Sequence, residues 1–328
     1  MSGLDPLQRA FINRFQGGFP LVERPFHGVA AELGTNETTL IQSIRRLCDE
    51  GWLSRFGPLF DAERLGGCFT LAALAVPEAD FARVAEQVNA LEEVAHNYRR
   101  EHPLNMWFVL ATEGAAARDD AIRTIERETG LPVHDFPKLE SFHLGFNLHL
   151  DAEGAVGIRR VEPRPFAPAR PPDRLDRAIV AATQAGLPLV PEPYAAIAEE
   201  IGADQPTLLV RLAELLASGA VRRIGAVPNH YKLGLRGNGM TVWDVPDHRV
   251  EQVGHRLGAR EEVTHCYRRP RHPPLWPYNL FAMVHGRGRE EVEARVSRLV
   301  DEIGADSRAH ATLFSTAVLK KTGLRWAG

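Results

Sequence analysis

The stretch QGGFPLVERPFHGVAAELG (residues 16–34) returns later in the chain as QAGLPLVPEPYAAIAEEIG (residues 184–202). The two copies share nine residues at one constant offset of 168 positions. The same offset relates further pairs, namely Thr39 and Thr207, Gly51 and Gly219, and Leu65 and Leu233. A register held over about 60 positions predicts two homologous modules in one chain.

A proline-rich segment separates the two copies. VEPRPFAPARPPDR (residues 161–174) contains five prolines in fourteen residues. Proline removes backbone donors and favours extended conformations, so we expect a semi-rigid linker over residues 151–172. A head-to-tail fusion of this kind predicts an internal pseudo-dimer, in which each copy buries a face against its twin. Whether the fused chain forms a further homo-oligomer stays open.

Each module begins with a pattern that is typical of a helix-turn-helix. Residues 5–56 hold three apolar-periodic stretches, which are interrupted by turn residues. In the third stretch, Thr35 or Asn36 is the expected N-cap and Gly51 the expected end. The pattern predicts a first helix-turn-helix over residues 1–57 and a second over residues 173–225.

The remainder of each module predicts strands and helices in the order β-α-β-β-α-β. In the first module these stretches are residues 69–77, 80–91, 94–101, 105–112, 117–130 and 137–148, and in the second they are residues 238–246, 248–258, 262–270, 278–286, 289–304 and 311–321. This order is that of a ferredoxin-like domain, expected over residues 58–150 and 226–328. The predicted fold class is therefore α+β, with two tandem modules.

Composition limits the classes of function. The chain has 328 residues, 44% hydrophobic and 25% charged, with a formal charge of −3. The charge argues against a protein whose main task is to neutralise phosphates. No run of about 18 apolar residues and no signal-peptide pattern occur, so we expect a cytoplasmic protein without a membrane span. The three cysteines form no Cys-x-x-Cys pair, and no metal site is predicted.

A helix-turn-helix followed by a ferredoxin-like domain resembles the Lrp/AsnC transcription regulators, so DNA binding has to be considered. A recognition helix needs outward-facing Arg, Lys, Asn or Gln side chains. The candidate DQPTLLVRLAELLASGA (residues 204–220) offers only Arg211, and the first module offers Arg45 and Arg46 beside acidic residues. We expect nucleic acid not to be the partner, although a DNA-binding regulator remains the alternative.

The pentapeptides HNYRR (residues 96–100) and HCYRR (residues 265–269) lie in corresponding predicted strands. Since residues two apart share a face, histidine, tyrosine and the second arginine should line one side of each strand. Converging arginine forks suit a ligand with several carboxylates. A lone strand histidine is more often a hydrogen-bonded structural residue, but the duplication beside arginines favours a binding site.

The two copies differ at positions that bear on function. RRIGAVPNHYKLG (residues 222–234) has His230 where its counterpart SRFGPLFDAERLG (residues 54–66) has Ala62. Five extra residues within PRHPPLWPYN (residues 270–279) lengthen the second hairpin and bring aromatic side chains, which suit the rim of a pocket for a large flat molecule. The two halves therefore no longer have the same role.

The patterns RRIGAVPNH, HCYRR and WPYNLFAMVHG in the second half, and SRFGPLFDAERLGG and HNYRREHPLNMWFV in the first, resemble the siroheme decarboxylases. This resemblance covers nearly the whole chain. It implies removal of two acetate carboxyl groups from siroheme as carbon dioxide. The product would be 12,18-didecarboxysiroheme, on the route to heme d1 or on an alternative route to heme.

The resemblance also implies roles for individual residues. His230 and His265 would act as an acid/base or orienting pair, assisted by Tyr267, since histidine titrates near neutral pH. His96 would be an iron ligand or a remnant of the duplicated site. The expected substrate-binding residues are His96, Tyr98, Arg99, Arg100, Arg268, Arg269, Asn279 and Trp276.

No cofactor is expected beyond the iron tetrapyrrole substrate, because its conjugated ring can accept the electrons itself. The expected partners are siroheme and, for hand-over of the product, other enzymes of heme d1 biosynthesis. A non-catalytic tetrapyrrole carrier is a further alternative, since binding and decarboxylation would use the same arginines.

Overall fold

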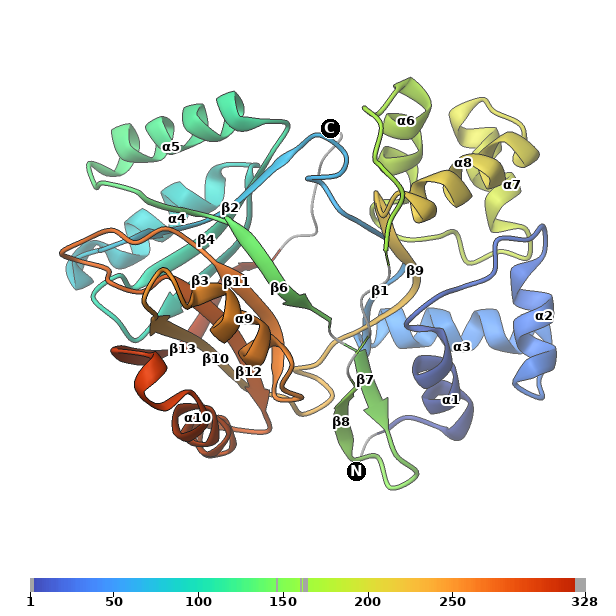
Figure 1. The fold of residues 1–328 in the computed structure, drawn as a ribbon. Coiled ribbons are helices and arrows are strands. Elements are labelled where there is room, and N and C mark those ends of the chain that lie inside the picture. The colour runs from blue at the N-terminus through green and yellow to red at the C-terminus, as the bar shows by residue number, and fades with distance from the viewer. Residues whose placement is uncertain (1–2, 146, 160, 162–164, 322–328) are drawn as a thin grey trace.

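The computed structural model describes residues 3–145, 147–159, 161 and 165–321. It has two lobes, one with the helices of both helix-turn-helix units and one with a large β-sheet and its covering helices (Figure 1). Among the described residues, no helix has the length and apolar character needed to cross a membrane.

The helices of the first lobe follow the predicted pattern in both modules. Asn36 begins the third helix by accepting a hydrogen bond from the Thr39 backbone N–H at 2.9 Å. Gly51 ends this segment with a φ of 72°, a backbone conformation that suits glycine. The helices are α1 (Pro6–Phe15), α2 (Pro25–Glu32) and α3 (Glu37–Asp49), then α6 (Arg174–Thr183), α7 (Pro193–Ile201) and α8 (Gln205–Ala217).

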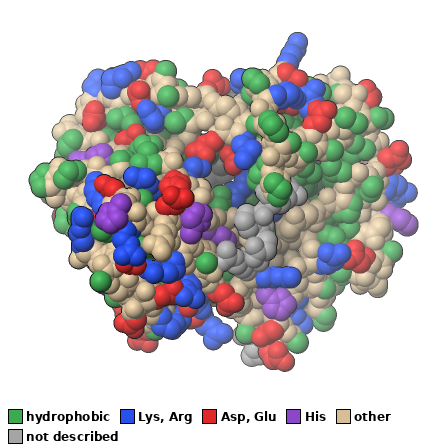
Figure 2. Space-filling view, viewed as in Figure 1, with side chains coloured by type: hydrophobic (Ala, Val, Ile, Leu, Met, Phe, Trp, Pro, Cys, Tyr) green, Lys and Arg blue, Asp and Glu red, His purple; other side chains and the backbone are tan. Residues whose placement is uncertain are grey.

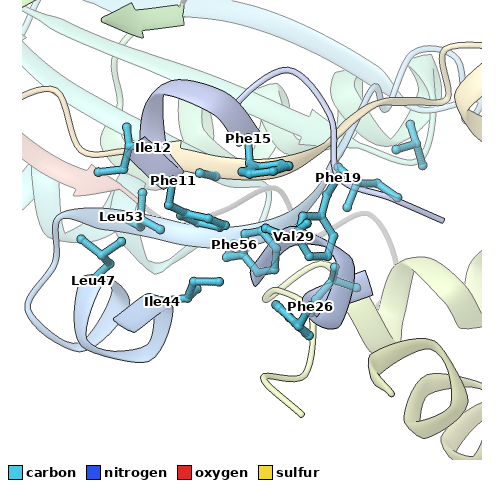
Figure 3. Packing of buried hydrophobic residues seen from close by; sticks show 14 of the residues in the cluster. Phe11, Ile12, Phe15, Phe19, Phe26, Val29, Ile44, Leu47, Leu53 and Phe56 are labelled. Atoms are coloured by element: carbon cyan, nitrogen blue, oxygen red, sulfur yellow. The ribbon is translucent and has the colours of Figure 1, made fainter. Parts of the chain in front are cut away.

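The two helix-turn-helix units share one hydrophobic core. Phe11 and Phe56 of the first unit belong to the same buried cluster as Ile179 and Tyr194 of the second, and Figure 3 shows the first unit's part of it. The Tyr194 hydroxyl also donates a hydrogen bond to the Pro20 carbonyl at 2.9 Å. The units therefore stabilise one another and do not stand as separate domains.

A two-stranded sheet joins the modules within this lobe. Strands β1 (Leu53–Phe60) and β9 (Val221–Pro228) pair antiparallel, with Gly57 opposite its counterpart Gly225. This pairing of equivalent residues lies on the pseudo-twofold axis. We expected each helix-turn-helix to end and each ferredoxin-like domain to begin between residues 57 and 58 and between residues 225 and 226. Both boundaries fall inside these strands, because each strand pairs with a strand of the other module.

The second lobe contains a nine-stranded sheet in the order β5-β2-β4-β3-β13-β10-β12-β11-β6. Helices α4 and α5 share a core with the strands of the first module, and α9 and α10 with those of the second. The strands are β2 (Cys68–Leu74), β3 (Val94–Arg100), β4 (Met106–Thr112), β5 (His134–Pro137), β6 (Glu140–Leu144), β10 (Gly237–Asp244), β11 (Val263–Arg268), β12 (Leu280–Gly286) and β13 (Ala309–Lys321). The helices are α4 (Phe81–Ala90), α5 (Ala115–Thr129), α9 (Val250–Gly258) and α10 (Arg289–Ile303). The predicted β-α-β-β-α-β order is confirmed in both modules.

The closing strand of each module crosses to the other module. The first part of β13 pairs with β10 of its own module, and the part from Ser315 to Lys321 pairs with β3. In the first module, β5 pairs with β2, while β6 pairs with β11. The single closing strand predicted over residues 137–148 is therefore wrong, because between Pro137 and Glu140 this segment passes from one edge of the nine-stranded sheet to the other.

A hairpin made of β7 (Asn147–Leu150) and β8 (Val156–Arg159) precedes the linker. The side-chain amide of Asn13 in α1 binds both the N–H and the carbonyl of Leu150, and that of Gln16, the C-cap of α1, binds both groups of Leu148, at 2.6 to 3.0 Å. The linker expected over residues 151–172 thus contains a strand, and its residues 160 and 162–164 lie outside the described residues.

Substitution of Gly225 tests the contact at the pseudo-twofold axis. A Cβ atom at this position would lie 2.2 Å from the Phe15 carbonyl oxygen, so Gly225→Ala forces the backbone apart. We expect the free energy of unfolding in urea to fall by about 1–3 kcal/mol. The control is Gly18→Ala at an exposed position with no neighbour within 4 Å, expected within about 0.5 kcal/mol of the unsubstituted protein. Equal effects of the two substitutions would contradict this packing.

Candidate active site

The first and third side chains of each pentapeptide face the core that the two modules share. Tyr98 lies opposite Trp107 of β4, and Tyr267 opposite Phe281 of β12. Trp107 and Phe281 both belong to one buried cluster built from strands of both modules. His96 and His265, two residues before each tyrosine, share this face, as strand alternation predicts.

Arg100 and Arg269 also point inward, but each is bound to the backbone of the other module. Nη1 of Arg100 donates a hydrogen bond to the Leu313 carbonyl of β13 at 2.7 Å, and Nη1 of Arg269 donates one to the Phe136 carbonyl of β5. Burial lowers the pKa of both guanidinium groups to about 10. Each guanidinium thus already binds a backbone carbonyl through one nitrogen, and its role as a carboxylate anchor stays a prediction.

Arg99 and Arg268 lie on the opposite face of their strands. Arg99 stacks over the Phe81 ring of α4, with its Cζ 4.4 Å from the ring centroid, and pairs with Glu78 at 2.7 Å. Arg268 shares its face with Cys266, which is buried in the core beneath α9. The substrate-binding role of these two arginines stays a prediction, on the face away from the shared core.

Asn279 also proves to be a structural residue. Its amide binds the backbone N–H and carbonyl of Val245 at 3.0 and 2.9 Å, which joins the ends of β10 and β12. The counterpart Asn105 binds both backbone groups of Val76 in the same way. Both polar atoms of the Asn279 side chain therefore bind the backbone, and its contact with substrate stays a prediction.

Trp276 does not form a pocket rim. It is fully buried between Trp107 and Phe281, at ring centroid distances of 5.0 and 5.7 Å. The neighbouring His272 reaches the Asp135 carbonyl of the first module at 2.7 Å. The five-residue insertion therefore packs across the module interface, and Trp276 belongs to the core and not to a binding surface.

The predicted pair His230 and His265 is connected through two residues that the sequence analysis missed. The Thr264 hydroxyl oxygen lies 2.9 Å from Nδ1 of His265 and 3.2 Å from Nδ1 of His285. The His285 ring is in turn 5.4 Å from the His230 ring, centroid to centroid. We call His230, Thr264, His265 and His285 the histidine cluster.

Other polar groups from both modules surround the histidine cluster. Tyr231 stacks beside His230 at a centroid distance of 4.2 Å, and its hydroxyl accepts a hydrogen bond from Asn238 at 3.3 Å. The Lys321 ammonium, at the end of β13, lies 5.0 Å from the Tyr231 ring centroid. Arg222 of β9 is close enough to His265 to act on its charge. These residues belong to the second module, while His143 of β6, in the first module, also acts on the charge of His265.

The histidines are neutral in the absence of a ligand. Burial, together with the positive charge of Lys321, lowers the pKa of His96 and of His230 to about 4. Burial and nearby positive groups, Arg222 first among them, lower the pKa of His265 to about 3. Burial raises the pKa of Tyr267 to about 12, so this phenol stays protonated. An anionic ligand would raise the histidine pKa values, because it would compensate the positive charge.

The cluster is built beside only one of the two pentapeptides. His96 pairs with Val109 as His265 pairs with Met283, so Ala111 is the counterpart of His285. Ala95 likewise corresponds to Thr264, and Ala62 corresponds to His230. The difference between Ala95 and Thr264 is visible when VAHNYRR is compared with VTHCYRR. A threonine beside a histidine is common, however, and the sequence alone does not show that the two side chains are in contact.

The surface view shows a hollow between the two lobes, bordered by acidic and basic side chains (Figure 2). Within the described part of the chain, the neutral acid/base groups are the imidazoles of the histidine cluster and the Tyr267 phenol. Arg222 provides a cation beside them. Such an arrangement suits an anionic substrate and a proton transfer.

Comparison with known proteins finds relatives that match this chain over one or both of its modules. Residues 64–143 and 232–320 match the AsnC-like ligand binding domain, and residues 8–53 and 176–222 match the siroheme decarboxylase NirDL-like HTH domain. A siroheme decarboxylase of Hydrogenobacter thermophilus is 33% identical over 95% of this chain and 92% of its own. The siroheme decarboxylase NirH subunit of Paracoccus pantotrophus is 54% identical over 47% of this chain and 96% of its own.

A solved structure agrees with this match over both modules. The crystal structure of the siroheme decarboxylase NirDL in complex with an iron-uroporphyrin III analogue superposes with a TM-score of 0.73. The two sequences are 29% identical, and the match covers 98% of this chain and 93% of the other.

The neutral histidines predict a loss of stability in mild acid. Their folded-state pKa values lie below the value of about 6.5 in an unfolded chain, so the unfolded chain binds more protons. Stability present above about pH 6.5 is therefore lost as the pH falls toward about 4. Each histidine contributes up to about 1.4 kcal/mol per pH unit.

Urea unfolding of the ligand-free protein between about pH 8 and about pH 5 measures this slope. The variant His265→Asn should show a shallower decline than the unsubstituted protein, because one titrating group is gone. Identical slopes would contradict the burial of a neutral His265.

Proposed function

The chain belongs to the siroheme decarboxylase family, and we propose that it decarboxylates siroheme at the histidine cluster. The main support is the histidine cluster, in which Thr264 contacts both His265 and His285 and the His285 ring packs near His230. The chain also matches this family over nearly its full length. We propose further that two acetate groups are removed, to give 12,18-didecarboxysiroheme for heme d1 biosynthesis. The iron belongs to the substrate.

The reaction requires one proton for each carboxyl group lost. The carbon–carbon bond to the carboxylate breaks and carbon dioxide leaves, while the electron pair stays on the methylene carbon and the conjugated ring. A proton delivered to that carbon completes a methyl group. A positioned histidine is a suitable donor, because its charge changes within the pH range of the cell.

Binding of the substrate would prepare His265 for this step. Without a ligand, burial and nearby cations keep this imidazole neutral, and a neutral imidazole is a poor acid. The carboxylates of siroheme would reverse the local charge and raise the pKa of His265, so that binding is accompanied by proton uptake. Tyr267, a neutral phenol on the same face, would donate a hydrogen bond to a carboxylate.

Arg222 and Lys321 are proposed as carboxylate anchors in addition to the pentapeptide arginines. Arg222 acts on the charge of both His265 and Tyr267, and Lys321 on that of both His96 and His230. These two cations therefore lie at the two ends of the site. His96 and Tyr98 would contact the macrocycle at the end near Lys321, with His96 either as an iron ligand or as a remnant.

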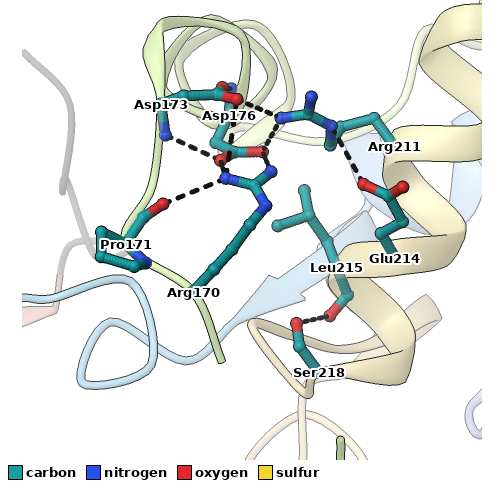
Figure 4. A network of polar contacts seen from close by, with 8 residues as sticks. All are labelled: Arg170, Pro171, Asp173, Asp176, Arg211, Glu214, Leu215 and Ser218. Carbon is teal, nitrogen blue, oxygen red and sulfur yellow. Dashed lines mark hydrogen bonds and ion pairs between the residues drawn. The ribbon is translucent and has the colours of Figure 1, made fainter. Parts of the chain in front are cut away.

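The helix-turn-helix lobe offers little to DNA. In the candidate recognition helix α8, Arg211 forms ion pairs with Asp173 at 2.6 Å, Asp176 at 3.0 Å and Glu214 at 3.2 Å (Figure 4). In α3, Arg45 donates a hydrogen bond to the Leu189 carbonyl of the other module at 3.0 Å. These contacts favour a packing role for both helices. Hand-over of product to other enzymes, further self-association and a cytoplasmic location remain predictions.

Incubation of the purified protein with siroheme, in the absence of oxygen, tests the function. Mass spectrometry should show loss of two carboxyl groups, whereas siroheme that is bound but unchanged would indicate a carrier.

Two substitutions test the assignment of residues. His230→Ala and His265→Ala should each lower turnover by at least about tenfold, since both take part in proton transfer. Siroheme binding, followed by the visible absorption of the macrocycle, should persist. The matched control is His248→Ala, at an exposed position outside the site, which should keep full turnover. Full activity of both site variants would contradict the assignment.

A further inference from the structure

We propose that Thr264 and His285 form a proton relay that connects His230 to His265 and fixes which ring nitrogen of His265 carries a proton. The proposal rests on the function given above and deepens it. Both residues act through His265 and are therefore positioning residues.

A bulge in β11 makes the contact between Thr264 and His265 possible. Neighbouring residues in a regular strand point to opposite faces, so their side chains do not meet. The pairing of β11 with β12 shifts between Val263 and His265, and this irregularity places Thr264 beside the imidazole that follows it. Thr264 is fully buried and His285 is nearly so, so the contact is shielded from solvent.

The hydrogen-bonding capacity of one hydroxyl limits what the two histidines can do. The Thr264 oxygen lies 2.9 Å from Nδ1 of His265, 3.2 Å from Nδ1 of His285 and 3.3 Å from the Met283 carbonyl. It carries one proton, so it can donate to only one of these three acceptors. At least one of the two imidazoles must then donate its own Nδ1–H to Thr264. The tautomers of His265 and His285 are therefore coupled.

This coupling allows a proton to move toward the substrate. When an anionic substrate is bound, His230 first takes up a proton and passes one to Nε2 of His285, whose ring centroid lies 5.4 Å from its own, and Nδ1 of His285 then releases its proton to the Thr264 oxygen. The hydroxyl passes its original proton to Nδ1 of His265, so that one proton enters and one leaves at each step. His265 then carries protons on both nitrogens, and Nε2, the nitrogen turned away from Thr264, can protonate the substrate carbon.

The charged and titratable groups around the relay belong to several elements. Those that act on His265 are Arg222 of β9, His143 of β6, His230 and Arg269; those that act on His285 are His230, His265, Arg295 of α10 and Arg100 of β3. All the cationic groups among them disfavour a lasting positive charge on the relay. A proton is therefore stabilised there only when an anionic substrate is bound.

The first module provides an internal comparison. Its strand β3 has the same register shift, between Val94 and His96, but Ala95 stands in place of Thr264. Ala111 likewise stands in place of His285. The backbone geometry is retained and the relay groups are missing, so proton delivery is built into the second module alone.

The test uses Thr264→Val, which keeps the shape and removes the hydroxyl, and Thr264→Ser, which restores it. We expect Thr264→Val to lower kcat by about tenfold or more and to change its pH profile, with siroheme affinity retained. Thr264→Ser should recover most of the activity. Thr264→Ala, the residue that the first module carries at this position, provides a second variant should valine disturb folding.

The matched control is Thr241→Val. Thr241 is a fully buried threonine of the neighbouring strand β10, and its hydroxyl binds the Ala282 carbonyl and the Trp243 indole N–H at 2.9 and 3.0 Å. The Thr241→Val protein should have a lower free energy of unfolding, but its kcat should keep the pH profile of the unsubstituted protein. An equal loss of kcat in Thr241→Val and Thr264→Val would overturn the relay.

A readout without substrate separates this proposal from the proposed function. Nitrogen NMR of the protein labelled in its histidines should show a changed protonation pattern of His265 and His285 in Thr264→Val, and a pattern close to the original in Thr264→Ser. An unchanged pattern in Thr264→Val overturns the relay even if the protein decarboxylates siroheme. If the histidine protonation pattern changes in Thr264→Val but the unsubstituted protein does not decarboxylate siroheme, the proposed function is contradicted, whereas the coupling of the His265 and His285 tautomers is supported.

Discussion

The exchange of closing strands between the modules is the interaction on which the rest of the structure depends. β3 has β13 of the other module as its outer neighbour, and β11 has β6. Without this exchange, both histidine strands would be sheet edges with unpaired backbone groups. Arg100 binds the Leu313 carbonyl of β13, and Arg269 binds the Phe136 carbonyl of β5, the strand that directly precedes β6. Removing either arginine's partner would leave a charge in the core, which makes this arrangement costly to undo.

The duplicated scaffold carries chemistry that is no longer duplicated. The fold, the strand bulge and the arginine contacts are the same in both copies, and they concern the stability of the shared core. His230, Thr264 and His285, in contrast, correspond to alanines in the first module. The packing of the shared core and the chemistry of the site thus constrain the same strands. Only the packing requires the two copies to be alike.

Local patterns account for much of what the sequence predicted. Helix caps, apolar periodicity and the repeat gave the two modules, and strand alternation placed His265 and Tyr267 on the inner face. Pairings between distant residues, such as β1 with β9, have no local signature. The type of a side chain also does not reveal its partner: an arginine that holds the Phe136 carbonyl and one that binds a substrate look alike in sequence. The backbone contacts of Arg269 and Asn279 were not predicted for this reason.

The second part of the linker is held in place by the hydrogen bond from the Ala167 N–H to the Ala217 carbonyl and by the ion pairs of Arg170 with Asp173 and Asp176. A tether of this kind keeps the two halves at a high effective concentration. It also fixes the stoichiometry at one copy of each. Halves made as separate chains could assemble with themselves into pairs that have two histidine clusters or none. Translation as one chain means that every molecule has one complete site, so the first copy can carry alanines at the cluster positions without yielding inactive assemblies.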